Sequence, residues 1–181
     1  MTKALIVIDI QNDYFIGGAM QLIGSEAAAK NASRVLRNFR EAGLPVILVQ
    51  HIALSPNATF FLPGTQGAEI HPDVAPIDGE VVVTKHFPNS FRETSLAETL
   101  AALNTNELTV VGMMTHMCVD TTVRAANDAG FKVTLVGDAC ATLDLEFEGR
   151  TVAAADVQAA YLAAIDGSFA NVISTTALLG E

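Results

Sequence analysis

The sequence predicts an α/β fold in which a six-stranded parallel sheet is flanked by helices on both faces. The first observation is a set of short apolar runs rich in β-branched residues, at residues 4–10, 46–50, 81–84, 108–113, 132–137 and 171–175. The second is that helical patterns separate most of these runs, and strands that alternate with helices form parallel sheets. The third is that no internal repeat or linker interrupts the 181 residues, half of which are apolar. We therefore expect one domain, covering residues 1–181, with a substantial core.

Helical patterns with recognisable ends lie between the predicted strands. The first begins at Ser25, which can cap a helix, and ends at Gly43. Its apolar stripe consists of Ala28, Ala32, Val35, Leu36 and Phe39. A second pattern opens with a capping box from Ser95 to Glu98. A late pattern, closed by Gly167, carries the stripe Val157, Ala160, Tyr161, Ala164 and Ile165.

Two irregular segments interrupt this alternation. Residues 51–80 carry no helical stripe, and long loops inside a compact domain are usually functional. Phe60 and Phe61 in this loop would line a pocket, fill a groove of a neighbouring subunit, or simply pack a satellite cluster. The second segment, residues 11–18, would bring Gln11 and Phe15 to the same cavity.

Composition and charge exclude several classes of partner. The formal net charge is −10 and the pI is near 4.7, which argues against binding nucleic acid through its phosphates. The purely apolar runs are too short to span a membrane, and the one near the N-terminus is too short for a secretory signal. We expect a cytoplasmic protein that acts on a small molecule, without a nucleic-acid or membrane partner.

The two cysteines are predicted to have different roles. A disulfide between Cys118 and Cys140 is not expected in a reducing compartment, and no spacing of Cys or His indicates a structural zinc site. Cys140 is interpreted as a packing residue beyond a strand. Cys118 follows a strand and lies in the first turn of a helix, with Thr115 as the N-cap and Gly130 as the stop.

Three residues with catalytic potential follow three different predicted strands. Asp9 and Lys85 each end an apolar run, and the turn that carries Cys118 follows a third. Carboxyl ends of parallel strands share one edge of the sheet, so the three side chains should converge there. The helix dipole favours an anion in the first turn, so we expect the Cys118 thiol to ionise more easily than a free cysteine. The alternative is a small buried hydrophobe at Cys118 and a capping residue at Asp9.

Three segments resemble the signatures of the isochorismatase-like cysteine hydrolases. They are residues 7–15 (VIDIQNDYF), 85–91 (KHFPNSF) and 112–119 (GMMTHMCV), and residues 137–142 (GDACAT) match a later strand of that family. The resemblance covers essentially the whole chain in the right order, and the motifs are specific in combination. It implies a Rossmann-like fold with a six-stranded parallel sheet, in agreement with the pattern above.

The resemblance also implies roles for individual residues. Asp9, Lys85 and Cys118 would form a catalytic triad, with Cys118 as nucleophile and Asp9 as general acid and base. The oxyanion hole would consist of the backbone N–H groups of Met114 and Cys118, with a cis peptide bond just before Met114. Substrate-binding candidates near this site are Gln11, Phe15, Phe60, Phe61 and His116, although His116 would alternatively be solvated at the pocket rim.

The chain departs from the nicotinamidases at their metal site. Those enzymes carry an Asp-x-His pattern after the second strand, whereas here the position reads VQHIAL at residues 49–54. We therefore predict no metal and no cofactor, and interpret His51 as a hydrogen-bonded residue at a strand end. The leading hypothesis for activity is hydrolysis of a C–N bond in a small amide or carbamoyl compound through a Cys118 thioester.

Two other functions remain open, together with the state of assembly. One is isochorismatase-type hydrolysis of a vinyl ether, in which Asp9 would act as general acid. The other is a redox-active thiol protein that retains the fold without hydrolase activity. A homo-oligomer, either a dimer or a tetramer, is expected because the family commonly assembles, with the Phe pair and the Ala-rich late helix as candidate contacts.

Overall fold

The predicted fold class is confirmed by a computed structural model, which describes residues 2–181. One sheet has the strand order β3-β2-β1-β4-β5-β8, and all its neighbouring strands are parallel. Its strands are β1 (Thr2–Ile8), β2 (Val46–His51), β3 (Val81–Lys85), β4 (Thr105–Met113), β5 (Lys132–Ala141) and β8 (Asn171–Ile173). Each overlaps one of the predicted apolar runs.

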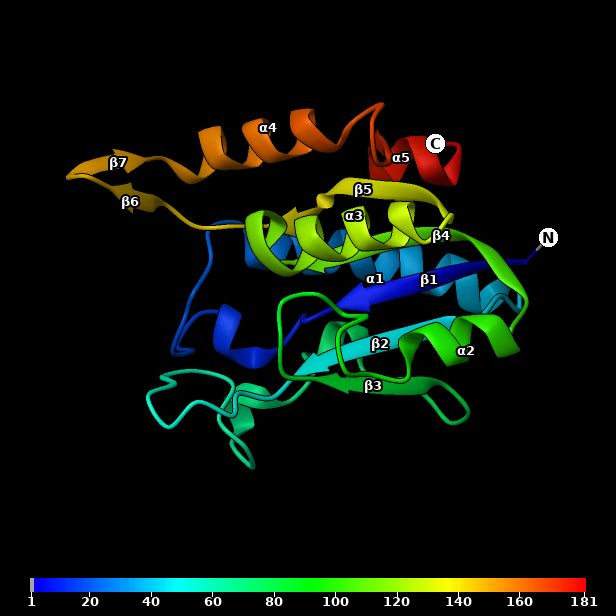
Figure 1. The fold of residues 1–181 in the computed structure, drawn as a ribbon, viewed down its shortest axis with the longest axis horizontal. Coiled ribbons are helices and arrows are strands. Elements are labelled where there is room, and N and C mark those ends of the chain that lie inside the picture. The colour runs from blue at the N-terminus through cyan, green and yellow to red at the C-terminus, as the bar shows by residue number, and fades with distance from the viewer. Residues whose placement is uncertain (1) are drawn as a thin grey trace.

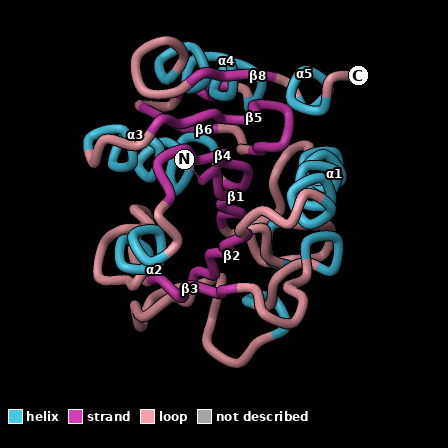
Figure 2. Tube along the Cα trace, turned by 90° about the vertical axis from the view of Figure 1, so that its right-hand side faces the viewer, coloured by secondary structure: helices cyan, strands magenta, loops and turns pink. Residues whose placement is uncertain are grey.

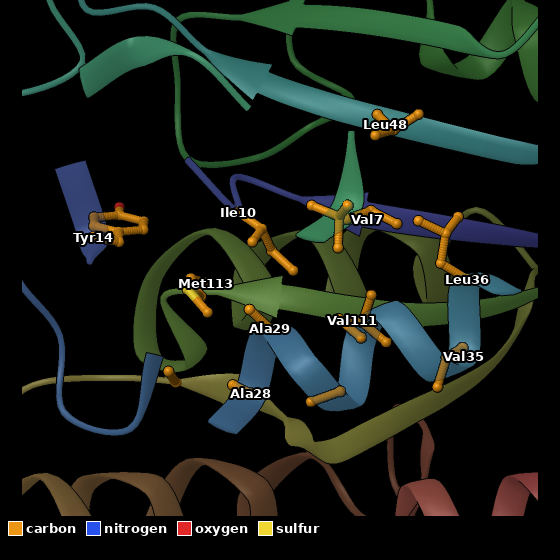
Figure 3. Packing of buried hydrophobic residues seen from close by; sticks show 14 of the residues in the cluster. Val7, Ile10, Tyr14, Ala28, Ala29, Val35, Leu36, Leu48, Val111 and Met113 are labelled. Atoms are coloured by element: carbon orange, nitrogen blue, oxygen red, sulfur yellow. The ribbon is translucent and has the colours of Figure 1, made fainter. Parts of the chain in front are cut away.

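Helices cover both faces of this sheet (Figure 2). They are α1 (Ser25–Glu41), α2 (Leu96–Ala102), α3 (Asp120–Asp128), α4 (Ala154–Ile165) and α5 (Thr175–Leu179). Alternate residues of β1 point to opposite faces, since Leu5 and Val7 pack in one apolar cluster and Ala4 and Ile6 in the other. The first cluster includes the buried stripe of α1, whose side chains point at the sheet in Figure 3. The second cluster is covered by α2 and α3.

The N-terminal caps of two helices differ from the predictions, whereas the predicted stops Gly43 and Gly130 lie just beyond the ends of α1 and α3. Gly24, with φ of 78°, occupies the N-cap of α1, so Ser25 is the first helical residue instead of the cap. Ser95 is the N-cap of α2, but within the described chain its side chain makes no capping bond, and Leu96 N–H bonds Thr94 Oγ1 at 3.3 Å instead. Capping depends on local backbone angles, which residue preferences do not specify.

Two further differences concern strands. The short hairpin β6 (Leu145–Phe147) and β7 (Arg150–Val152) was not predicted, and it projects from the body of the molecule beside α4 (Figure 1). Strand β5 continues past residue 137 and includes Cys140, which is buried within the strand instead of beyond it. Among the described residues, no helix has both the length and the apolar character needed to cross a membrane.

The long irregular loop contains two single-turn helices. These are 3-10 helices, η2 (Gln66–Ala68) and η3 (Pro72–Val74), while η1 (Asn12–Tyr14) lies in the segment after β1. Asn12 N–H donates to the Glu69 carbonyl at 3.0 Å, and Asp13 accepts from the N–H of Phe61 at 2.6 Å. The two irregular segments are therefore bonded to each other beyond the carboxyl ends of β1 and β2.

Candidate active site

Four neighbouring strands deliver polar side chains to one edge of the sheet. Asp9 follows β1, and His51 and Lys85 are the last residues of β2 and β3. Cys118 lies in the turn η4 (Thr115–Val119), which connects β4 to α3. The strand order reverses between β1 and β4, and such switch points are where open α/β sheets bind ligands.

Lys85 lies at the centre of this group. Its side chain is fully buried, and Nζ is 2.6 Å from Asp9 Oδ2, 2.8 Å from His51 Nδ1 and 3.3 Å from Cys118 Sγ. An ammonium group has three hydrogens, and the three neighbours offer one acceptor each. The structure thus brings together Asp9, Lys85 and Cys118, and adds His51 as a fourth member.

Backbone geometry at the strand ends aims these side chains. Asp9 has a φ of 49°, which ends β1 at Ile8 and turns the chain out of the sheet. Gly112 of β4 pairs with Ile8, and a Cβ at Gly112 would lie 2.1 Å from the Ile8 carbonyl oxygen. Only glycine permits β1 and β4 to approach this closely, which sets the separation of Asp9 from the turn that carries Cys118.

Burial makes Asp9 a stronger base and leaves Lys85 charged. Removal from water raises the pKa of Asp9 despite the opposing charge of Lys85. Burial alone would lower the pKa of Lys85, but the negative charge of Asp9, to which a Cys118 thiolate adds when it forms, outweighs burial and the pKa is raised. The site therefore holds an ammonium ion beside a carboxylate that readily accepts a proton.

The expected low pKa of the Cys118 thiol was wrong. Burial is the largest cause of a strongly raised pKa, and the neighbouring charge of Asp9 adds to it, whereas Lys85 only partly offsets them. The prediction rested on the helix dipole, which is a weaker effect than removal of a thiolate from water. The resting thiol is therefore protonated, and a base must remove its proton during attack.

The turn around Cys118 also differs from a capped α-helix. Met114 occupies the cap position, and its carbonyl oxygen accepts from the N–H groups of Met117 at 3.1 Å and Val119 at 3.2 Å. The bond to Val119 is the wide spacing of a π-helix. Thr115 was predicted as the N-cap, but its hydroxyl donates to the Ala141 carbonyl at 3.2 Å and ties the turn to β5. The peptide bond between Met113 and Met114 is cis, as the resemblance implies.

Gln11 is occupied by backbone groups. Its side-chain amide donates to the carbonyl oxygens of His51 at 2.9 Å and Ala68 at 2.7 Å, and its Oε1 accepts from the N–H of His51 at 2.8 Å. The side chain is fully buried. Gln11, a candidate for substrate binding, thus holds the end of β2 against the long loop.

The aromatic candidates pack within their own chain. Phe61 is buried, with its ring 4.6 Å from that of Tyr14 and 5.8 Å from that of His51. Phe60 is half-buried and contacts the rings of both Tyr14 and Phe61. Phe15 is stacked on His71 at 3.8 Å. Phe61 therefore contacts the site by way of the His51 ring. Phe60 and Phe61 do not form the exposed surface that was considered as a contact between subunits.

His116 faces the last helix. Its Nδ1 is 2.6 Å from Thr142 Oγ1, and its ring meets Tyr161 of α4 edge-on at 5.9 Å. Burial lowers the pKa of the His116 ring below the usual histidine value, so the ring is uncharged at neutral pH. These contacts join the Cys118 turn to the end of β5 and to α4.

Two residues of the site had not been assigned to it from the sequence. His51 was predicted as a hydrogen-bonded strand-end residue, and it is one, but its bond to Lys85 was not foreseen. The register of β2 and β3 pairs His51 with Lys85. Knowledge of this register would have predicted the contact, but the sequence alone does not give it. Tyr14 is the other: its ring lies 4.6 Å from that of Phe61, which in turn lies 5.8 Å from the His51 ring, and burial raises the pKa of the phenol.

One group of residues could in principle bind a metal ion. Asp9, His51 and Cys118 present ligand atoms within 4.8 Å of one another, and no other such group occurs among residues 2–181. Lys85 Nζ lies within bonding distance of a ligand atom of each of the three. The Lys85 ammonium thus occupies the position that a metal ion would need between these three side chains. The group therefore suits a lysine better than a resident metal ion.

Comparison with known proteins identifies close relatives. The isochorismatase domain family matches residues 3–177. The isochorismatase family protein YddQ of Bacillus subtilis is 49% identical over 179 residues, and the alignment covers 99% of both chains. The solved structure of an isochorismatase from Pseudomonas putida is 38% identical with a TM-score of 0.90, covering 97% of this chain and 89% of that one. Nicotinamidase 3 of Arabidopsis thaliana is 32% identical, with 82% of this chain and 78% of that protein covered.

Proposed function

Because this chain belongs to the isochorismatase family of hydrolases, we propose that it hydrolyses a C–N bond in a small amide or carbamoyl compound through a thioester on Cys118. The observation that carries the proposal is the position of Lys85 Nζ between Asp9 Oδ2 and Cys118 Sγ. A buried base, a fixed positive charge and a thiol at the start of a helix are the groups that acyl transfer requires. The similarity to a nicotinamidase, an enzyme named for an amide substrate, agrees with this choice.

The first half of the reaction forms the thioester. Asp9 takes the thiol proton as Cys118 Sγ forms a bond to the carbonyl carbon, and the C=O electron pair moves to the oxygen. The C–N bond then breaks, and the leaving nitrogen takes the proton from Asp9. The raised pKa of Asp9 suits both transfers, because the carboxyl group must accept and then return one proton.

The second half releases the acid. Asp9 removes a proton from water as the water oxygen attacks the thioester carbon, and the C–S bond breaks. The thiolate takes the proton back from Asp9, which restores the resting site. Lys85 stabilises the sulfur while it is negatively charged in both halves. In this proposal the N–H groups of Met114 and Cys118 hold the oxyanion.

Vinyl-ether hydrolysis is less well supported by the contacts of the cationic groups. An isochorismate-like substrate carries two carboxylates, which need positively charged partners. Lys85 Nζ is already engaged by Asp9, His51 and Cys118, each within 3.3 Å. The Arg92 guanidinium lies over the Phe87 ring at 3.6 Å, and its Nε is 3.6 Å from Glu93.

Intact-protein mass spectrometry tests the proposal directly. Wild type, Cys118→Ala and the control Cys140→Ala are incubated with a panel of small amides and carbamoyl compounds. We expect a transient adduct on wild type and on the Cys140 variant, with a mass that identifies the acyl group, and none on Cys118→Ala. Equal turnover of an enol ether by wild type and Cys118→Ala, without any adduct, would transfer the assignment to acid catalysis by Asp9.

A further inference from the structure

His51 is the one partner of Lys85 that has no part in the bond changes of the proposed reaction. Asp9 and Cys118 exchange a proton and a bond with the substrate, whereas His51 accepts a hydrogen bond at 2.8 Å. His51 and Lys85 are paired residues at the ends of β2 and β3, so their side chains leave the sheet side by side. The imidazole therefore contacts the ammonium in the resting site without taking part in the proposed bond changes.

The charge of Lys85 determines the protonation of the ring. An ammonium group only donates hydrogen bonds, so Nδ1 of His51 must be the unprotonated nitrogen and Nε2 carries the hydrogen. A doubly protonated ring would place two positive charges 2.8 Å apart, and accordingly burial and the charge of Lys85 lower the pKa of His51 to about 4. The imidazole is thus a neutral acceptor aimed at Lys85.

The backbone of His51 is itself held firmly. Gln11, fully buried, bonds both the N–H and the carbonyl oxygen of His51. The Phe61 ring lies 5.8 Å from the imidazole, and Phe61 is anchored in turn by its N–H bond to Asp13. These contacts hold the backbone of His51 and pack against its ring without involving Lys85.

We propose that His51 is a positioning residue, which holds the Lys85 ammonium between Asp9 and Cys118 by accepting its third hydrogen bond. The inference rests on the proposed function only in taking Cys118 as the nucleophile. Without an acceptor at this position, one buried N–H of Lys85 has no partner, and the ammonium turns away from Cys118 to find one. The thiolate then loses its nearest positive charge, and less of it forms at any given pH.

Alkylation of Cys118 by iodoacetamide tests this without any substrate. The rate at constant pH reports the thiolate fraction, and a Cys140→Ser background leaves Cys118 as the only thiol. His51→Leu removes the acceptor at similar volume, and we expect the rate to fall about tenfold, which corresponds to a rise of one pKa unit. His51→Asn restores an acceptor oxygen near the position of Nδ1, and its rate should return to within about threefold of the parent. Equal rates for the parent and His51→Leu would overturn the proposal.

A double-mutant cycle distinguishes an effect of His51 on the position of Lys85 from a change in how easily iodoacetamide reaches Cys118. If His51 acts through Lys85, His51→Leu has no further effect on alkylation in a Lys85→Met background. A tenfold loss that persists in that background overturns the proposal. Should the Lys85 variant not fold, a crystal structure of His51→Leu decides, since an unchanged Nζ–Sγ separation of 3.3 Å would refute it. If no compound of the amide panel gives an adduct but the alkylation rates follow the prediction, the proposed reaction is rejected and the positioning role of His51 stands.

Discussion

At the scale of residues, the site is a buried ion pair between Lys85 and Asp9. Lys85 and Asp9 are both fully excluded from solvent, and each is costly to bury without the other. The same burial that makes the pair costly also keeps the Cys118 thiol protonated at rest. Stability and reactivity of this site therefore depend on the same charges.

Replacement of Lys85 by methionine should destabilise the fold in a pH-dependent way. The change leaves Asp9 buried without a counter-ion, and we expect a loss of about 3–5 kcal/mol in the free energy of unfolding at pH 8. Without Lys85 the raised pKa of Asp9 rises further, so the folded state binds a proton that the unfolded chain releases near pH 3.8. The loss therefore grows as pH rises from that value through the folded pKa. Urea titrations at pH 5 and pH 8 measure it.

Controls for this prediction come from an exposed lysine and from the partner acid. Lys30→Met on the surface of α1 should change stability little at either pH. Asp9→Asn combined with Lys85→Met should recover much of the lost stability, because no buried charge remains. An equal loss at both pH values would contradict the prediction.

His51 should remain neutral well into the acid range. Its pKa in the folded state is lowered to about 4 by burial and then by Lys85, against 6.5 for the free side chain. The unfolded chain therefore binds more protons between these values, and this contribution to stability is lost as pH falls from 6.5 to 4. NMR titration of the His51 ring protons should give the low midpoint, and unfolding of His51→Asn should depend less on pH across this window. A His51 midpoint near 6.5 would exclude the arrangement.

At the scale of elements, the site depends on how closely β1 and β4 approach. Gly112 has a φ of 140° and faces the Ile8 carbonyl, so its lack of a side chain is a structural requirement. The strands on either side of this contact carry Asp9 and the Cys118 turn. A change in their separation alters the catalytic distances directly.

Gly112→Ala should therefore be far more disruptive than Gly137→Ala. At Gly112 the new Cβ would meet backbone at 2.1 Å, whereas at Gly137 of β5 it would meet the flexible tip of Leu162 at 3.0 Å. We expect Gly112→Ala to lower the free energy of unfolding by about 3 kcal/mol or more, and Gly137→Ala by less. Thermal unfolding and the iodoacetamide rate of Cys118 measure both effects. Similar free energies of unfolding for the two variants would show that β4 can move away from β1 without loss of stability.

At the scale of the whole molecule, one hairpin projects away from the sheet (Figure 1). The hairpin β6–β7 projects beyond the sheet next to α4 (Figure 1), and the side chain of Phe147 at its end is 73% exposed. A two-stranded hairpin by itself is marginally stable in water. We therefore continue to expect a homo-oligomer, with the hairpin as a contact in place of the Phe60–Phe61 pair.

Phe147→Ser should weaken this assembly. Sedimentation velocity at micromolar concentration is expected to give a dimer or tetramer for wild type and a smaller species for the variant, because the exposed ring would lose its buried position between subunits. Ile16→Ser is a matched control, since Ile16 is 76% exposed but lies in the segment after η1. A wild-type monomer would reject the prediction of assembly.

The order of strands and helices and the residues at the strand ends were predictable because their signals are local. Apolar runs, helical stripes and stop residues are read within a few positions, and each predicted run overlaps a strand of the sheet. The convergence of Asp9, Lys85 and Cys118 followed from the rule that parallel strands end at one edge. The hairpin β6–β7 was missed because each of its strands is only three residues long, which is too short to show a periodic pattern.

What the sequence determined by itself is the fold class and the edge of the sheet where the chemistry lies. Only the tertiary structure decided that His51 bonds Lys85, that Gln11 holds His51, that a π-turn carries Cys118, and that its thiol has a raised pKa. The first kind of property depends on periodicity within one segment. The second depends on strand register and on how much water remains around a charge, and both are set by residues far apart in the chain.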